Sequence, residues 1–538
     1  MLDLTIGNGV EEQNGSKLEL YDCTLREGEQ AAGASFDLAS RLKVFSALDD
    51  FGFDYVELGW PHASSEIMDS FEICKQKRKH SKIIAFGSTS INPDPEKDEN
   101  LLALLKSKAD CACIFGKSHL THVEKQLRIN GPKNLERISQ SIDFLIKNGM
   151  AVFFDAEHFF DAFQDNREYA LATVRTAIDA GAQRVILCDT NGGSMPTYVQ
   201  STIRETLDTL GGKRVLGVHF HNDRGLALAN TLVALDNIVQ VQGTVNGIGE
   251  RVGNLDFTQL VPILRLSYPE RMPSLLKTEA LKGLSQTVYE ASGLEVPPNS
   301  PFVGDYAFAH KGGVHIDATV KGANYEHSIP ELFGNKRKIV LNTLGGNAGV
   351  ISVAKQFGYE LDKKDPNVRK RVISLFRDLR SMEQRGYRIG GIEAEQYLLI
   401  ERHFGNLNRL FEIQGFRIES ESLHKKETSR FFMSGFVGRK PVMEEVSIEG
   451  GPVDAAYKTL VNILSLKYPR VKNLRIADFH ISIAKRRAEE STVRTEIYFE
   501  DGERFRTVGV GGNMFQSALE ALEKGFRYYL NRSAKAQP

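Results

Sequence analysis

The sequence predicts an α/β fold in which a (β/α)8 TIM barrel is followed by a mainly helical connector and a C-terminal α+β domain. Three observations lead to this prediction. Eight short apolar runs alternate with amphipathic stretches in the first half of the chain. Polar residues stand at the carboxyl ends of these runs, and the end of the chain contains an internal repeat.

The apolar runs are rich in β-branched residues, and each has the length of a strand. Helical patterns lie between them. In residues 134–149, apolar side chains three and four positions apart share a face, and Gly149 ends the helix. A strand–helix repeat of about 30 residues fits a closed parallel barrel of about 250 residues. The expected strands are 18–23, 53–59, 82–88, 111–117, 151–158, 184–190, 214–221 and 238–247.

The polar side chains at the ends of the runs favour a barrel over an open, doubly wound sheet, which alternates strands and helices in the same way. In a barrel these ends converge on one mouth, whereas in an open sheet they spread along an edge. The residues concerned are Asp22, Glu57, Glu157, Asp189, His219, His221 and Asn246.

A chain of 538 residues is too long for one core. In the expected connector, residues 277–292 and 343–412 have helical patterns, and the part between them is rich in Gly and Pro. A polar bridge, 419–430, opens the last domain. The expected parts are a polar tail (1–17), the barrel (18–275), the connector (276–418) and a C-terminal regulatory domain (419–538).

The C-terminal domain contains two copies of one pattern. A shift of 62 residues places 446–460 on 508–522, and each copy reads as a strand, a Gly-bearing turn and a helix. Such a module, separate from the barrel, suits regulation or dimerisation. A purely structural appendage is the alternative, because a fold alone does not determine a function.

Composition and charge exclude several classes of partner. Lys+Arg 68 against Asp+Glu 69 leave a net charge of −1, which gives no electrostatic reason to expect nucleic acid or an acidic membrane surface. No apolar run approaches the ~20 residues of a membrane span, and the first residues lack the order of a signal peptide. From these two observations we expect a cytoplasmic protein. The five cysteines are odd in number and widely spread, so we expect no disulfide framework.

His219 and His221 are the most informative pair of residues. In a strand, residues i and i+2 point to the same face, so both imidazoles project together at the end of the seventh strand. Asn222 and Asp223 follow directly and can orient the rings as hydrogen-bond acceptors. The pair therefore predicts a metal site.

Two histidines need an anionic ligand to hold a divalent ion firmly. Glu27 is distinguished by Arg26 before it and Gly28 after it, because an arginine there can stabilise a negative oxygen that develops at the metal. For Arg26 and Glu27 alone, an ordinary surface ion pair is the alternative. A mixed nitrogen and oxygen ligand set suits Zn, Mn, Co or Mg acting as a Lewis acid. Spacing does not rank the candidates Asp22, Glu27, Glu57, Glu157 and Asp189.

The glycines at 247, 249 and 253 follow the eighth strand, but their spacing and late position do not match a dinucleotide-binding fingerprint. We expect them to let the backbone turn tightly toward the site, which leaves Asn254 near the metal.

Two segments resemble the paired signatures of the metal-dependent Claisen-condensing enzymes, the 2-isopropylmalate, homocitrate and citramalate synthases. They are YDCTLREGEQ (21–30) and LGVHFHNDRGLALAN (216–230). The first departs from the family where Arg41 replaces the usual Lys, and Glu27 in place of the commoner Asp resembles homocitrate synthases. Longer stretches, such as FFDAEHFFDAF (153–163) and VQGTVNGIGER (241–251), look like the (R)-citramalate synthase branch.

The resemblance implies a role for each matching residue. The metal ligands would be Glu27, His219 and His221, with Asn254 as a further or water-mediated ligand. Arg26 would stabilise enolate and substrate oxygens, Thr190 would contact the carboxylate of the 2-oxo acid, and Glu157 would be a catalytic carboxylate. Groups acting on acetyl-CoA would be His315, Asp317 and Tyr325, with His315 and Glu157 the leading candidates for the base.

The resemblance also implies an activity. A divalent metal (Mn, Mg, Zn or Co) would help to condense acetyl-CoA, as co-substrate, with pyruvate. Thioester hydrolysis would then give (R)-citramalate and CoA, the first step of a threonine-independent isoleucine pathway. Family members are homodimers, and isoleucine would be the effector of the C-terminal domain. The alternatives are a 2-isopropylmalate or homocitrate synthase and, from a different class, a metal-dependent acyl-CoA lyase.

Overall fold

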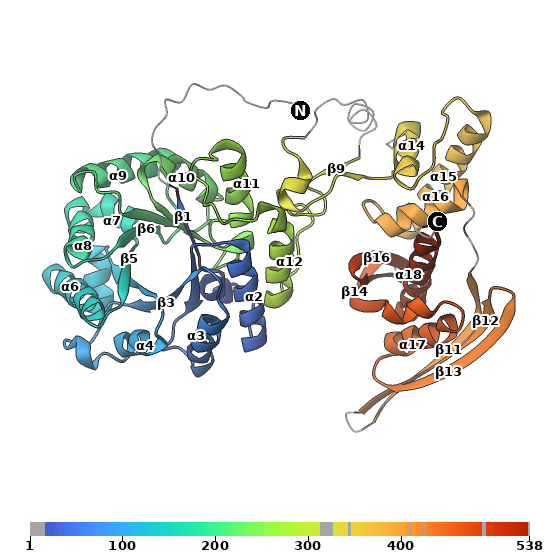
Figure 1. Cartoon of the computed structure of the whole chain (residues 1–538), viewed down its shortest axis with the longest axis horizontal. Helices are drawn as coiled ribbons and strands as arrows, with labels where there is room; N and C mark the ends of the chain where they lie inside the picture. Colours follow the sequence, from blue (N-terminus) through green and yellow to red (C-terminus); the bar gives the residue numbers. More distant parts are fainter. Residues whose placement is uncertain are drawn as a thin grey trace. The chain divides into compact units, whose positions relative to one another are not determined.

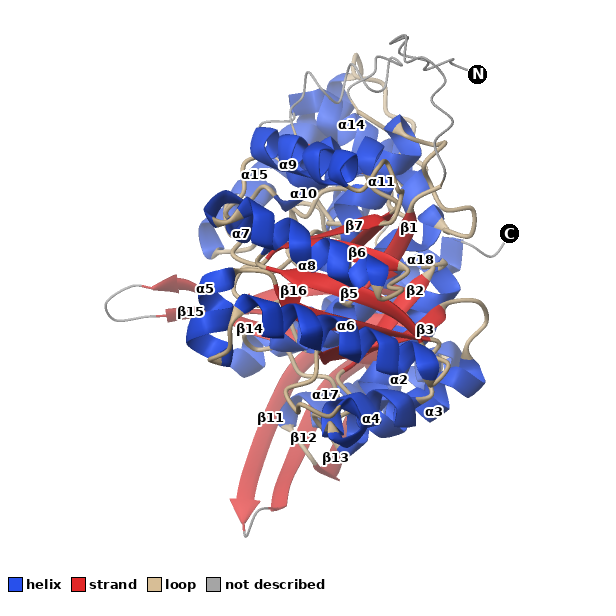
Figure 2. Cartoon of the chain, turned by 90° about the vertical axis from the view of Figure 1, so that its left-hand side faces the viewer, coloured by secondary structure: helices blue, strands red, loops and turns tan. Residues whose placement is uncertain are grey.

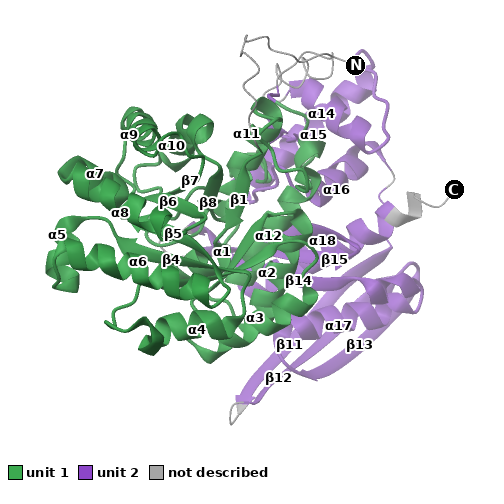
Figure 3. Cartoon of the chain, turned by 60° about the vertical axis from the view of Figure 1, so that its left-hand side comes forward, with its two compact units in different colours: residues 1–307, 328–336 green, residues 308–327, 337–538 purple. Residues whose placement is uncertain are grey.

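The computed structural model describes residues 17–311, 326–342, 346–405, 407, 410–423, 426–486 and 491–535. Its contacts divide the chain into two compact units (Figure 3). The first comprises Met1–Ala307 with Ser328–Lys336, and the second Phe308–His327 with Arg337–Pro538. The limits expected for the tail, the connector and the C-terminal domain stay predictions.

The first unit contains a closed barrel of eight parallel strands in sequence order, as expected. Closure comes from the pairing of β1 with β8, in which Tyr21 is the register partner of Gln242. Each strand lies within the apolar run expected for it. The strands are β1 (Glu19–Asp22), β2 (Tyr55–Gly59), β3 (Lys82–Ser88), β4 (Cys111–Lys117), β5 (Ala151–Glu157), β6 (Arg184–Asp189), β7 (Leu216–Phe220) and β8 (Gln240–Gly243).

Helices surround the barrel on its outside (Figures 1 and 2). In α6, the Asn130 side chain accepts a hydrogen bond from the amide of Lys133, which caps the first turn. The helix ends just before Gly149, whose φ is +83°. The helices are α1 (Thr24–Glu27), α2 (Leu38–Phe51), α3 (Ser65–Lys77), α4 (Glu99–Ser107), α5 (Leu120–His122), α6 (Gly131–Lys147), α7 (Phe159–Asp165), α8 (Arg167–Asp179), α9 (Pro196–Thr209), α10 (Ala227–Ala234), α11 (Phe257–Ser267) and α12 (Leu281–Ser292).

One cluster of buried side chains fills the lumen of the barrel. Because its members come from six different strands or their ends and alternate along each strand, they identify the inward-facing positions. Farther toward the carboxyl ends, the inward positions are Phe115 and Lys117 in β4 and Asp155 and Glu157 in β5. The cluster consists of Tyr21, Cys23, Tyr55, Ile84, Phe86, Cys111, Cys113, Phe153, Ile186 and Cys188.

Among its described residues, the second unit begins with a short parallel pair of strands and three helices, which confirm the helical pattern expected within 343–412. Two three-stranded antiparallel sheets follow, each with one helix. The elements are β9 (Ala309–His310), β10 (Lys338–Ile339), α14 (Gly346–Gln356), α15 (Pro366–Arg385), α16 (Glu393–Phe404), β11 (Phe411–Leu423), β12 (Lys426–Val437), β13 (Lys440–Glu449), α17 (Pro452–Ser465), β14 (Arg475–Arg486), β15 (Ser491–Asp501), β16 (Glu503–Gly511) and α18 (Met514–Lys535).

The internal repeat is confirmed, and in each copy two further strands precede the aligned strand, turn and helix. The two copies are β11–β12–β13–α17 and β14–β15–β16–α18. Gly450 and Gly512 occupy equivalent places, between the last strand of each copy and its helix. The polar bridge expected at 419–430 was wrong: most of these residues belong to β11 and β12, which pair as a hairpin. They are polar because most of their side chains there are exposed.

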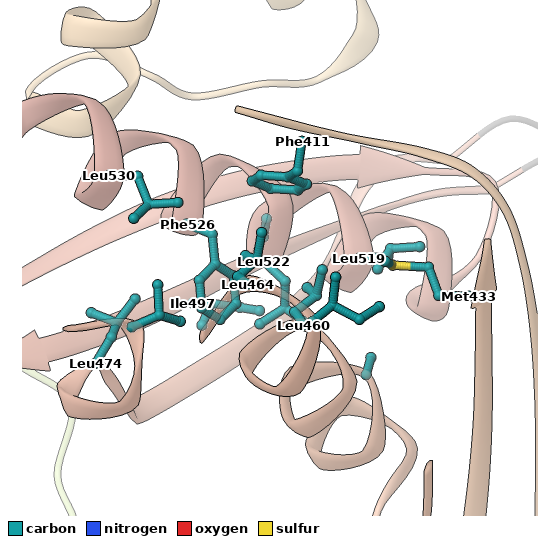
Figure 4. Close-up of a cluster of buried hydrophobic side chains, with 14 of the residues drawn as sticks. Phe411, Met433, Leu460, Leu464, Leu474, Ile497, Leu519, Leu522, Phe526 and Leu530 are labelled. Atoms are coloured by element: carbon teal, nitrogen blue, oxygen red, sulfur yellow. The ribbon is translucent and has the colours of Figure 1, made fainter. Parts of the chain in front are cut away.

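The helices of the two copies share one apolar core (Figure 4). Leu460 and Leu464 of α17 and Leu522 and Phe526 of α18 belong to the same buried cluster, together with Ile497 of β15. Neither copy therefore has a complete core of its own.

Among the described residues, no helix combines the length and the apolar character that crossing a membrane requires.

Removal of one buried leucine should destabilise the second unit, whereas removal of an exposed one should not. Leu522 is 0% exposed and Leu466 is 86% exposed. We expect Leu522→Ala to lower the free energy of unfolding by about 2–5 kcal/mol, because it leaves a cavity. Leu466→Ala should change it by less than about 0.5 kcal/mol. Guanidinium unfolding followed by far-UV circular dichroism measures both, and equal effects would contradict the assigned core.

Candidate metal centre

The structure brings Glu27, His219 and His221 together at the carboxyl end of the barrel. Each residue offers one ligand atom, and the three atoms lie within 4.8 Å of one another. Nε2 of His219 is 3.4 Å from Nε2 of His221 and 3.6 Å from Oε1 of Glu27. The two histidines come from β7 and its end, and Glu27 comes from α1 directly after β1. All three side chains are buried.

Three of the polar residues at strand ends hydrogen-bond to other segments of the chain instead: two stabilise turns, and one binds a helix. Asp22 accepts hydrogen bonds from the amide and the hydroxyl of Thr24, at 3.0 and 2.8 Å. Asp189 accepts from the amides of Gly193 and Ser194. Asn246 bonds to Ser285 of α12. Of the acidic candidates left open by spacing, Glu27 is thus the one that lies with the two histidines.

Arg26 connects Glu27 to a second buried carboxylate. Its guanidinium donates to Glu27 and to Glu57, and it lies 3.7 Å from the centre of the Phe86 ring. Glu57 also accepts a hydrogen bond from the Tyr21 hydroxyl. The alternative of an ordinary surface ion pair does not describe Arg26 and Glu27, because both side chains are at least nine-tenths buried.

The protonation states suit a cation. Burial alone would raise the pKa of Glu27, but Arg26 and the two imidazoles lower it to about 2. Burial, with a contribution from His219, lowers the pKa of His221 to about 4. Burial also lowers the pKa of His219. At neutral pH the site therefore has one carboxylate and two neutral imidazoles, which are the forms that bind metals.

Two buried acceptor oxygens at the site have no hydrogen-bond partner among the described residues. They are Oε2 of Glu27 and Oδ1 of Asn254. Buried acceptors without partners are unfavourable, and a bound divalent cation provides the missing partner for such a set. The residues present therefore fit a divalent metal ion.

Asn254 reaches the site through a glycine-rich turn, as expected. Its Nδ2 lies 3.1 Å from Nε2 of His219, and its backbone bridges that of His221. Gly253 has a φ of +92°, and a Cβ there would lie 1.8 Å from the carbonyl oxygen of Gly247. A Cβ on Gly249 would lie 1.9 Å from Oδ1 of Asn254. Both glycines are needed for this turn.

Lys117, Glu157 and Thr190 lie at neighbouring strand ends of the same mouth. Nζ of Lys117 is 2.7 Å from Oε2 of Glu157, and the two residues are register partners. Thr190 follows β6, and its Oγ1 accepts from the amide of His158 at 2.9 Å. Because this oxygen is an acceptor, the hydroxyl hydrogen can still be donated to a ligand. The roles of Glu157 and Thr190 stay predictions.

His315, Asp317 and Tyr325 lie outside the described residues.

Arg41, where the sequence departs from the signature, is buried beside α1, the helix that contains Arg26 and Glu27. Its guanidinium donates to the carbonyl oxygen of Leu58 at 2.9 Å and pairs with Glu29. Arg41 therefore connects the turn that follows α1 to the end of β2.

The sequence reasoning missed Gln242 and Asp155. Nδ1 of His219 lies 2.9 Å from Oε1 of Gln242, whose Nε2 donates to Asp155 at 3.0 Å. A signal was present, because both are polar residues at inward strand positions, Asp155 in the largely apolar β5 and Gln242 in β8.

Comparisons with known proteins agree with this architecture. Residues 17–288 match the HMGL-like family, residues 302–382 the homocitrate synthase post-HMGL domain-like family, and residues 392–530 the LeuA allosteric (dimerisation) domain. An (R)-citramalate synthase of Geobacter sulfurreducens is 38% identical over 531 residues, which cover 97% of this chain and 99% of the relative.

The chain belongs to the (R)-citramalate synthase family. An (R)-citramalate synthase of Aquifex aeolicus is 37% identical over 96% of this chain and 98% of its own length. A probable 2-isopropylmalate synthase of Methanopyrus kandleri is 32% identical, but the match covers 65% of this chain and 67% of the relative. Membership of this family makes the protein an enzyme of the acyltransferase type.

Replacement of a ligand should weaken metal binding strongly without unfolding the protein. We expect His219→Ala to weaken Mn²⁺ binding at least about 100-fold, since it removes one of three ligand side chains. Isothermal titration calorimetry of the metal-free protein measures the affinity, and circular dichroism checks the fold. His480→Ala, at a half-exposed side chain in the second unit, should bind Mn²⁺ like the wild type. Wild-type affinity in His219→Ala would remove His219 from the centre.

Proposed function

We propose that the protein condenses acetyl-CoA with pyruvate and hydrolyses the thioester to give (R)-citramalate and CoA. Similarity over the whole length of (R)-citramalate synthases is the observation that supports this activity best. The cluster of Glu27, His219 and His221 supports a metal-dependent reaction, because it offers the ligands that a divalent ion needs.

We assign the metal to Glu27, His219 and His221, with Asn254 as a further or water-mediated ligand. A divalent ion bound there supplies a Lewis acid that polarises the ketone of the 2-oxo acid. Thr190 contributes a hydroxyl that donates to the carboxylate of this substrate. Its backbone supports this role, because Arg251 binds the Thr190 carbonyl oxygen at 2.8 Å and so fixes the end of β6.

Arg26 stabilises the negative charge that develops on oxygen during the condensation. Two carboxylates and the Phe86 ring hold the guanidinium in place. A donor oriented before the reaction needs no reorganisation when the charge appears, which is how preorganised groups lower a barrier.

A base must remove a proton from the methyl group of acetyl-CoA, and Glu157 and His315 are our candidates. Lys117 forms an ion pair with Glu157 and so holds the Glu157 carboxylate at the inward-facing end of β5. Asp317 and Tyr325 complete the groups that we assign to acetyl-CoA. The enolate carbon then attacks the ketone carbon, and water cleaves the thioester with release of the CoA thiol.

A panel of 2-oxo acids tests the activity. We expect release of free thiol from acetyl-CoA with pyruvate, and much slower release with 2-oxoisovalerate or 2-oxoglutarate. Ellman's reagent follows the thiol, and chiral chromatography identifies the (R)-product. His219→Ala and omission of the 2-oxo acid are the controls. Activity on 2-oxoisovalerate or 2-oxoglutarate without activity on pyruvate would identify a 2-isopropylmalate or homocitrate synthase instead.

We further propose that the enzyme is a cytoplasmic homodimer that isoleucine inhibits, as the first enzyme of a threonine-independent isoleucine pathway. The match of residues 392–530 to an allosteric (dimerisation) domain supports a dimer and an effector.

Isoleucine should therefore slow thiol release from acetyl-CoA and pyruvate, whereas leucine at the same concentration should have a smaller effect. Light scattering after size exclusion measures the mass, which for a dimer is twice 60.0 kDa. A monomer, or a rate that isoleucine does not change, would contradict the respective part of this proposal.

A further inference from the structure

A buried set of polar side chains crosses the barrel lumen behind the metal centre. Gln242 of β8 lies between the register partners Tyr21 of β1 and His219 of β7. Gln242 is 0% exposed and Asp155 is 4% exposed. Polar groups so deep in an apolar lumen are unfavourable unless they are fully hydrogen-bonded, so their arrangement is strongly constrained.

Gln242 determines which nitrogen of His219 bears the hydrogen, and Asn254 agrees with it, because its Nδ2 can only donate and lies 3.1 Å from Nε2 of His219. Its Oε1 lies 2.9 Å from Nδ1 of His219, and an amide oxygen can only accept, so Nδ1 must donate. In the neutral ring Nε2 then bears the lone pair. Nε2 is also the atom that faces Glu27 and the other imidazole.

Asp155 in turn determines which way the Gln242 amide points. Its Oδ1 accepts from Nε2 of Gln242 at 3.0 Å and from Sγ of Cys113 at 3.1 Å. A reversed amide would set its oxygen against this carboxylate oxygen and its NH₂ against Nδ1 of His219. The reversed arrangement would favour the tautomer of His219 that cannot present a lone pair at Nε2.

We propose that Gln242 and Asp155 are positioning residues that select the metal-binding tautomer and ring orientation of His219. This inference rests on the proposed metal-dependent function and adds to it a source of metal affinity outside the ligand set. Hydrogen-bond partners of metal-binding histidines commonly contribute in this way.

Substitution of Gln242 by an apolar residue of similar length tests the proposal. We expect Gln242→Met to weaken Mn²⁺ binding to the metal-free full-length protein about 10–100-fold, because His219 loses the acceptor that orients it. Titration calorimetry with Mn²⁺ alone measures this without any substrate.

Gln240→Met is a matched control. Gln240 is in the same strand and is also 0% exposed, but its Nε2 donates to Glu19 at 3.1 Å rather than serving a histidine. If the loss of Mn²⁺ affinity came only from the removal of a buried amide, Gln240→Met and Gln242→Met would weaken Mn²⁺ binding equally. Equal losses, or wild-type affinity in Gln242→Met, would overturn the proposal.

A double variant supplies a rescue. Gln242→Glu combined with Asp155→Asn keeps an acceptor for Nδ1 of His219 and reverses the hydrogen bond behind it, since the new amide at 155 donates to the new carboxylate at 242. We expect this variant to bind Mn²⁺ more tightly than Gln242→Met. Failure of the double variant to exceed Gln242→Met would also contradict the proposal. Absence of Mn²⁺ binding by the wild type would instead reject the proposed metal centre itself.

Discussion

The pairing of β1 with β8 is the constraint on which the rest of the site depends. Glu27 follows the first strand, whereas His219 belongs to the seventh, and almost the whole barrel separates them in sequence. They meet because the sheet closes and places Gln242 between the two strands. An open sheet with the same strands would leave the carboxylate and the imidazoles at opposite edges. The metal centre therefore depends on closure of the barrel as much as on the identity of its ligands.

Electrostatic balance at the centre follows from the same arrangement. Arg26 offsets the negative charge of the buried carboxylates that it binds, and the two neutral imidazoles add no charge. A divalent cation would add positive charge at the centre, which favours the binding of an anionic 2-oxo acid. Arg26 is the common partner of both carboxylates, so it keeps Glu57 away from the ligand atoms and leaves one oxygen of Glu27 available.

The sequence was sufficient for the barrel strands, because each lies in a short apolar run followed by a helical pattern, and for the repeat, because its copies align directly. It was also sufficient for His219 and His221, since residues two apart in a strand share a face. The sequence was insufficient to choose Glu27 over Asp22 as the metal ligand, because a position near the end of a strand does not show whether a carboxylate faces the barrel mouth or a neighbouring turn. Gln242 and Asp155 escaped notice because they are 87 residues apart and meet only in the folded lumen. The bridge at 419–430 was misjudged because a hairpin exposed to solvent is as polar as a linker.

The common core of the two C-terminal copies has a consequence for how this domain can evolve. Leu460 and Leu464 need Leu522 and Phe526 as neighbours, so the block of two copies is the smallest piece that can be gained, lost or transferred between proteins. A half-block would expose an apolar helix face and aggregate or fold incompletely. The duplication is therefore hard to reverse for a physical reason. Because the two copies share one core, the sequence of either copy can diverge, but neither copy can be lost without exposing the apolar face of the other.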